Sequence, residues 1–169
     1  MPNRRLMPDV ISSAQSLPTA AQTDMVVNAS KSMAFGGAGA IIITADGTPG
    51  SAILGIFTEH DLANRVVAVG RDPAHTRVVE VMTANPFALG PQATAKDALQ
   101  FMQRHHCTHL PVVDNGRLVG LASIKDLFIV ITGQLEENIA EVEDFVFGSG
   151  YSFDASKESR SSPYKIQYN

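Results

Sequence analysis

The sequence contains one short unit twice, and this internal repeat constrains the fold more than any other feature. Each copy holds two apolar runs joined by a turn, and the second run leads into Thr or Ser, two further residues and Asp. Met33 in the first copy matches Met102 in the second, and Asp61 matches Asp126. The turn of the first copy has four extra residues, 48–51. A unit of this size cannot bury a large core alone, so we expect the copies to pack together.

Apolar spacing and turn residues predict the same order of elements in both copies: helix, strand, strand, helix. For the first copy, the predicted ranges are 23–34, 40–44, 52–57 and 59–70. For the second copy, they are 94–105, 110–114, 117–122 and a long helix that begins at Ser123. Asn115-Gly116 is a strong hairpin signal because both residues tolerate positive φ. Thr94 and Asp97 form a variant of the capping box before the third helix.

Several segments of the second copy form a specific combination. They are 81–83 (VMT), 109–114 (HLPVVD) and 118–127 (LVGLASIKDL), and the first copy carries a match to the last one at 55–62 (GIFTEHDL). Together these segments resemble a tandem pair of cystathionine-β-synthase (CBS) domains, the Bateman module. The resemblance covers about residues 8–130.

The resemblance implies an α/β (α+β) fold of two βαββα units related by a pseudo-twofold axis. The two sheets should pack against each other and leave two clefts between the repeats. We expect a first CBS repeat at 8–72, a second at 78–132, and a C-terminal helix with a flexible tail at 133–169. The resemblance also implies a homodimer and regulatory binding of an adenosine-containing ligand, such as AMP, ADP or ATP, without catalysis or an obligatory cofactor.

Thr58-x-x-Asp61 and Ser123-x-x-Asp126 lie where a predicted strand passes into a predicted helix. A hydroxyl followed by a carboxylate three residues later is typical of a helix cap. An ionised Asp can also accept two donors, and the adjacent 2′- and 3′-hydroxyls of a ribose are such a pair. We therefore expect Asp61 and Asp126 each to bind a ribose, with the hydroxyls and helix N-termini facing phosphate. Lys125, between the paired positions, is expected to face away.

Four further residues complete the predicted nucleotide site. In the family, residues just before the strand predicted at 110–114 often face ligand phosphates, and His109 holds this position. Ala40 is the counterpart of His109 in the first copy, and Leu110 follows His109. Arg65 lies one helical turn after Asp61 and either neutralises phosphate or forms an ion pair with Asp61. The full set of predicted nucleotide-binding residues is Thr58, Asp61, Arg65, Ala40, Ser123, Asp126, His109 and Leu110.

Composition argues against several classes of protein. The net charge is −4 and no large basic block is present, so nucleic acid is not an expected partner. Cys107 is the only cysteine, which excludes an intramolecular disulfide. The first residues do not form an apolar signal-peptide core, and the longest apolar runs are too short to span a bilayer. We therefore expect a cytoplasmic protein without membrane contact.

Three other motifs receive a structural interpretation. Segment 36–39 (GGAG) resembles a phosphate loop, but it joins a helix to a strand, so we expect a helix-terminating turn. Segment 105–109 (HHCTH) could suggest a metal site, but adjacent residues point in different directions and no second ligand cluster is evident. Ser123, His109 and Asp126 could suggest a hydrolase, but the sequence has no nucleophile elbow.

The helix from Ser123 carries an apolar stripe, which we expect to form a homodimer contact and to be interrupted near Gly133. The stripe consists of Leu127, Phe128, Ile131, Leu135, Ile139, Val142 and Phe145. Our functional hypothesis is a module that senses an adenine nucleotide and signals to a separate, regulated protein. The alternative hypothesis is a ligand-free dimeric interaction scaffold, which the divergent first copy motivates.

Overall fold

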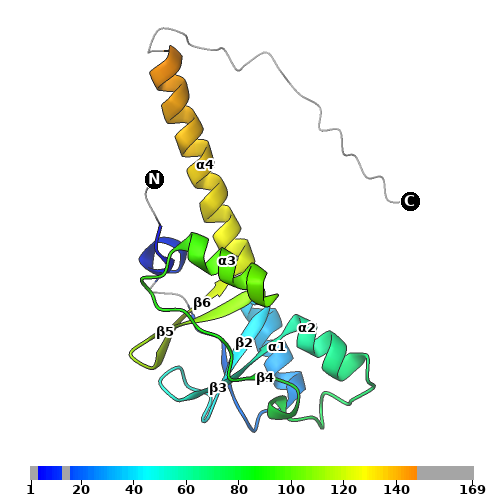
Figure 1. Ribbon diagram of the computed structural model, residues 1–169. Coiled ribbons are helices and arrows are strands. Elements are labelled where there is room, and N and C mark those ends of the chain that lie inside the picture. Colours follow the sequence, from blue (N-terminus) through cyan, green and yellow to red (C-terminus); the bar gives the residue numbers. More distant parts are fainter. Residues whose placement is uncertain (1–3, 13–15, 148–169) are drawn as a thin grey trace, which may run out of the picture. The chain divides into compact units, whose positions relative to one another are not determined.

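The computed structural model describes residues 4–12 and 16–147 (Figure 1). The chain divides into two compact units, residues 1–132 and 133–169, and both repeats lie in the first. The labelled elements are β1 (Thr19–Ala21), α1 (Val26–Gly36), β2 (Ala40–Thr44), β3 (Ile53–Thr58), α2 (Glu59–Asp61), β4 (Thr83–Ala84), α3 (Ala95–His105), β5 (His109–Asp114), β6 (Arg117–Ser123) and α4 (Ile124–Phe147). Short helical turns cover Leu6–Val10, Leu62–Val67, which continues α2, and Val78–Glu80.

Each repeat builds a sheet around one antiparallel strand pair (Figure 1). In the first repeat the strand order is β1-β2-β3-β4, with β1 parallel to β2 and the other pairs antiparallel. In the second repeat β5 pairs with β6, and Leu89 runs parallel to β5. The Leu89 amide donates to the Pro111 carbonyl at 3.0 Å, and its carbonyl accepts from the Val113 amide at 2.9 Å. Both repeats thus follow the βαββα order, with an isolated β-bridge at Leu89 in the place of the first strand of the second repeat, and the predicted fold class is confirmed.

The predicted turns are confirmed where the backbone needs unusual φ values. Gly37 ends α1 with a φ of 62°, so the Gly-rich segment is a helix-terminating turn. Asn115 and Gly116 join β5 to β6 with φ values of 48° and 79°. This conformation suits asparagine and glycine and follows the twist of the paired strands.

Two apolar cores each lie between a sheet and its helices, and the N-terminal segment belongs to the second. The first core contains Ala20, Val26, Ala29, Met33, Ile41, Ile43, Phe57, Val66, Val78 and Val81. The second contains Leu6, Ile11, Ala95, Ala98, Met102, Leu110, Val112, Ala122 and Leu127. The Leu6 amide also donates to the Ala93 carbonyl at 2.8 Å. Residues next to the first repeat in sequence therefore help to complete the second.

A third apolar cluster joins the repeats. Ala40, Ile42 and Ile56 from the first sheet pack with Leu118 and Leu121 from the second. Side chains alternate between the two faces of a strand, so the intervening residues of β2 turn into the first core instead. This cluster confirms the expected packing of sheet against sheet.

Helix α4 is continuous from Ile124 to Phe147, so the predicted interruption at Gly133 is wrong. Glycine inside a helix costs about 1 kcal/mol relative to alanine. Good helix formers such as Gln134, Leu135 and Glu136 follow it, so that cost does not end the helix.

Part of the apolar stripe on α4 is open to solvent. In the first unit Leu127 is fully buried, whereas Phe128 is 63% exposed. In the second unit Leu135 and Ile139 are exposed. The side chains of Val142 and Phe145, and the tail at 148–169, lie outside the described residues. The dimer contact along this stripe stays a prediction. None of the helices that the structure describes combines the length and apolar character that crossing a bilayer requires.

Candidate functional site

The same capping geometry occurs at the start of α2, α3 and α4, at Thr58/Asp61, Thr94/Asp97 and Ser123/Asp126. In each case the carboxylate accepts from the backbone amide and the hydroxyl of the first residue, and that hydroxyl accepts from the amide of the Asp. The helix-cap interpretation is therefore confirmed. What distinguishes the three carboxylates is their surroundings.

Asp126 lines a cleft of about 560 Å³ in the first unit. The cleft is formed by both repeats, with Gly36–Gly39 and Glu59 from the first and residues around the start of α4 from the second. The Oδ2 atom of Asp126 accepts from the Ser123 amide at 3.2 Å and from the Ser123 hydroxyl at 2.6 Å. Both of these bonds use Oδ2, and no bond from the rest of the described chain reaches Oδ1. This half-buried carboxylate thus keeps an acceptor atom for a molecule in the cleft.

His109 lies against the backbone of Gly39 in the same cleft. A Cβ atom on Gly39 would lie 3.0 Å from both Cε1 and Nε2 of the His109 ring, so the ring would have to shift to admit any larger residue here. The Nδ1 atom of His109 is 3.0 Å from the Thr108 hydroxyl. The other ring nitrogen, Nε2, therefore faces Gly39 and Glu59.

The environment of His109 sets its charge. Burial lowers the pKa of its imidazole, and the carboxylates of Glu59 and Asp126 partly oppose this shift. His109 is therefore mainly neutral at neutral pH, when one ring nitrogen donates and the other accepts.

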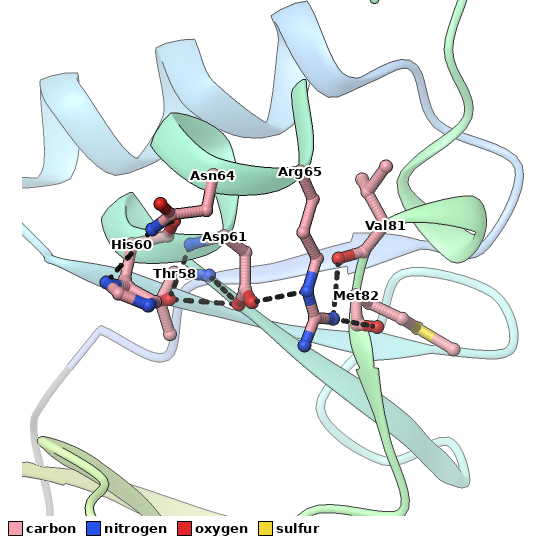
Figure 2. A network of polar contacts seen from close by, with 7 residues as sticks. All are labelled: Thr58, His60, Asp61, Asn64, Arg65, Val81 and Met82. Atoms are coloured by element: carbon pink, nitrogen blue, oxygen red, sulfur yellow. Dashed lines mark hydrogen bonds and ion pairs between the residues drawn. The ribbon is translucent and has the colours of Figure 1, made fainter. Parts of the chain in front are cut away.

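Asp61, unlike Asp126, takes part in a network of contacts within the protein, which Figure 2 shows. Its side chain is only 6% exposed, and its Oδ1 atom lies 3.3 Å from Nε of Arg65. One terminal nitrogen of Arg65 also donates to the carbonyls of Val81 and Met82, at 3.0 and 2.8 Å. Both oxygens of Asp61 are therefore engaged within the protein. Of the two roles expected for Arg65, the structure shows the ion pair.

The structure brings only part of the predicted site together. Ser123, Asp126 and His109 line the cleft, whereas Thr58, Asp61 and Arg65 form the network of Figure 2 and line neither described cleft. Ala40 is buried between the sheets, and Leu110 is buried in the second core. Because neighbouring side chains on a strand face opposite ways, Leu110 cannot share the cleft-facing position of His109.

Other residues of the cleft were missed by sequence reasoning. Lys125 is one of its lining residues, because the first turn of α4 borders the opening; the expected direction of its side chain stays a prediction. Glu59 and the backbone of Gly36–Gly39 come from the first repeat, and Ser16 and Pro18 precede β1. Only the pseudo-symmetry of the repeat could have indicated that these segments face the second repeat.

A second described cleft, of about 400 Å³, lies near the hairpin between β5 and β6. Its lining includes Ile53, Asn85, Pro111 and Val113, and no acidic or basic side chain from the described chain contributes to it. Among the described residues no three His, Cys, Asp or Glu side chains are placed to hold a metal ion.

Comparison with known proteins agrees with this architecture. The family model described as "CBS domain" matches residues 78–133. The Arabidopsis thaliana CBS domain-containing protein CBSCBSPB2 is 38% identical over 111 residues, which cover 61% of this chain and 21% of that protein. The chain thus spans about a fifth of the length of that relative.

Solved structures extend the similarity to both repeats. A protein with CBS domains from Burkholderia ambifaria is 33% identical, with a TM-score of 0.61, covering 82% of this chain and 88% of that one. The CBS domain protein PAE2072 from Pyrobaculum aerophilum, solved in complex with AMP, is 25% identical, with a TM-score of 0.60, covering 68% and 86%. With its duplicated βαββα unit and these relatives, the chain belongs to the CBS domain family.

Proposed function

We propose that this chain is a regulatory module that binds an adenosine-containing ligand in the Asp126 cleft. The observation that carries the proposal is the half-buried Asp126 carboxylate, which uses Oδ2 for the helix cap and presents Oδ1 to a cleft between the repeats. One ribose hydroxyl would donate to Oδ1, and the other would reach the remaining acceptor capacity of the carboxylate.

The shape and chemistry of the cleft support a nucleoside-sized ligand. A volume of about 560 Å³ falls within the range typical of small-molecule sites. Leu121 and Pro18 offer apolar surface to a base, while Lys125 at the start of α4 offers a donor to a phosphate. One CBS domain relative was solved with AMP, which supports the same ligand class here.

The proposal assigns one ligand to each chain. Asp61 already accepts from Thr58 and pairs with Arg65, so its carboxylate has no acceptor atom to spare for a ribose. Val130 stands in the second repeat where Arg65 stands in the first, so the carboxylate of Asp126 is not engaged in this way. The divergence of the repeats thus separates a structural aspartate from a binding aspartate.

CBS domains are generally regulatory, and the proposed role is binding without catalysis. A ligand that binds both repeats would favour one relative position of them, and this shift would signal to a separate partner protein. We retain the homodimer and the cytoplasmic location in the proposal. The exposed side chains of Phe128 and Ile129 on α4 support an association surface within the first unit.

The test compares Asp126→Asn with Asp97→Asn by isothermal titration calorimetry with AMP. Both variants weaken the same kind of helix cap, but Asp97 lines neither described cleft. We expect Asp126→Asn to lose at least about tenfold in AMP affinity, whereas Asp97→Asn stays within about twofold of the wild type.

Equal AMP affinity in both variants would refute the role of Asp126. If none of adenosine, AMP, ADP and ATP bound to the wild type or raised its melting temperature, the proposed binding would be refuted and the ligand-free scaffold would be favoured. This inference holds because any ligand that binds only the folded state must stabilise it.

A further inference from the structure

The charged side chains of the cleft do not favour a highly charged ligand. The charged residues of the described lining are two acidic ones, Glu59 and Asp126, and one basic one, Lys125. His109 adds little positive charge at neutral pH, because its imidazole is partly buried beside Gly39. The described side chains around the cleft thus carry a negative balance, although the proposed ligand class includes polyphosphates.

Glu59 makes the net charge of the cleft negative, and it comes from the first repeat, whereas Asp126 and Lys125 come from the second. It begins α2, and its backbone amide donates to the Gly39 carbonyl at 3.1 Å, which fixes its position at the cleft. Its Oε2 atom lies 3.6 Å from the position that a Cβ on Gly39 would take. Nε2 of His109 lies 3.0 Å from the same position, so the carboxylate and the imidazole are neighbours.

The N-terminus of α4 offsets this negative charge only in part. Backbone amides at a helix start attract anions, and Lys125 adds one positive charge. However, the carboxylate of Asp126 already occupies that helix end and accepts from the Ser123 amide at 3.2 Å. The start of α4 can therefore balance about one phosphate group, while each further phosphate would meet uncompensated repulsion from Glu59.

We propose that the cleft selects adenosine ligands with no more than one phosphate group, and that Glu59 is the residue that excludes ATP. This inference rests on the proposed function, because it assigns a ligand subclass to the same cleft. Ile124, the residue of the second repeat that matches Glu59, carries no charge. The selection is therefore a property of the one cleft that Glu59 and Asp126 share.

The experiment measures the affinities of adenosine, AMP, ADP and ATP by calorimetry, without magnesium and at low ionic strength. For the wild type we expect ATP to bind at least about tenfold more weakly than AMP. Glu59→Gln should reduce this gap about tenfold and leave adenosine affinity within about twofold. Glu59→Lys should make ATP bind more tightly than AMP. Glu59 is exposed, so neither variant threatens the fold.

The control is Glu80→Gln, which removes an exposed carboxylate that pairs with Arg71 and Arg77 and lines neither described cleft. This variant should keep the wild-type order of ligands. ATP binding as tightly as AMP in the wild type, or an unchanged ratio in both Glu59 variants, would overturn the selection by Glu59 and leave the adenosine site standing. Failure of all four ligands to bind the wild type would instead overturn the site itself.

Discussion

Replacement of Arg65 by methionine should destabilise the first unit without affecting the Asp126 cleft. The change keeps most of the aliphatic stem but removes the guanidinium group. That group bonds three acceptors at once: Oδ1 of Asp61 at 3.3 Å and the carbonyls of Val81 and Met82 at 3.0 and 2.8 Å. It therefore fastens α2 to the segment between the repeats (Figure 2).

The expected loss can be worked out from these contacts. Removing one partner of a buried ion pair costs about 3–5 kcal/mol. Here the Asp61 carboxylate is 6% exposed but keeps two hydrogen bonds from Thr58, and the Arg65 side chain is 48% exposed to solvent. Both facts reduce the cost, so we expect a loss of about 2 kcal/mol. Arg65→Lys should recover only part of it, because one ammonium group cannot reproduce the fork of donors.

Urea denaturation followed by circular dichroism measures this loss. The matched control is Arg71→Met, which breaks an exposed ion pair with Glu80 at 3.4 Å and should change stability little. If Arg65→Met cost no more than Arg71→Met, the network of Figure 2 would have no structural importance.

Two further predictions concern the cleft. Gly39→Ala should weaken AMP binding about fivefold in calorimetry, because the new methyl group would stand 3.0 Å from the His109 ring and displace it. His109→Gln should reduce the loss of stability on acidification from about pH 7.5 to about pH 5.5, measured by urea denaturation at both values. Burial lowers the pKa of His109 in the folded state, so the unfolded chain takes up its proton at a higher pH. Acidification therefore favours unfolding of the wild type through this residue, and glutamine removes that contribution.

Each of these predictions has a clear contrary result. Gly50→Ala is the control for Gly39→Ala, since nothing lies within 4 Å of a Cβ at that position. Equal AMP affinity in the two alanine variants would show that the close approach of Gly39 to His109 is irrelevant to binding. An unchanged pH dependence in His109→Gln would show that other groups set the acid sensitivity.

Much of the fold could be predicted because its signals are local. The strand at Ala40–Thr44 was predicted at its observed bounds, and the other repeat strands and α3 to within about one residue, because each combines regular apolar spacing with a clear turn or cap. The strand at Thr19–Ala21 was missed because three small residues carry little strand signal without the partner strand. The place of Leu6 in the second core depends on contacts far along the chain.

The candidate site likewise combines features that local sequence predicts with features that depend on contacts between distant segments. The caps at Asp61 and Asp126 follow from spacing, so their local geometry was predictable. The sequence motif made these two residues look equivalent, but their surroundings in the folded chain differ. Arg65 forms an ion pair with Asp61, whereas Asp126 lines a cleft. The place of Lys125 at the edge of the cleft likewise depends on how the start of α4 meets the first repeat.

Residues ahead of β1 contribute both to the core of the second repeat and to the lining of the cleft. Ile11 is anchored in the core of the second repeat, Thr19 begins the sheet of the first, and Ser16 and Pro18 between them line the cleft. The proposed ligand would therefore contact residues that lead into β1 as well as residues of the second repeat.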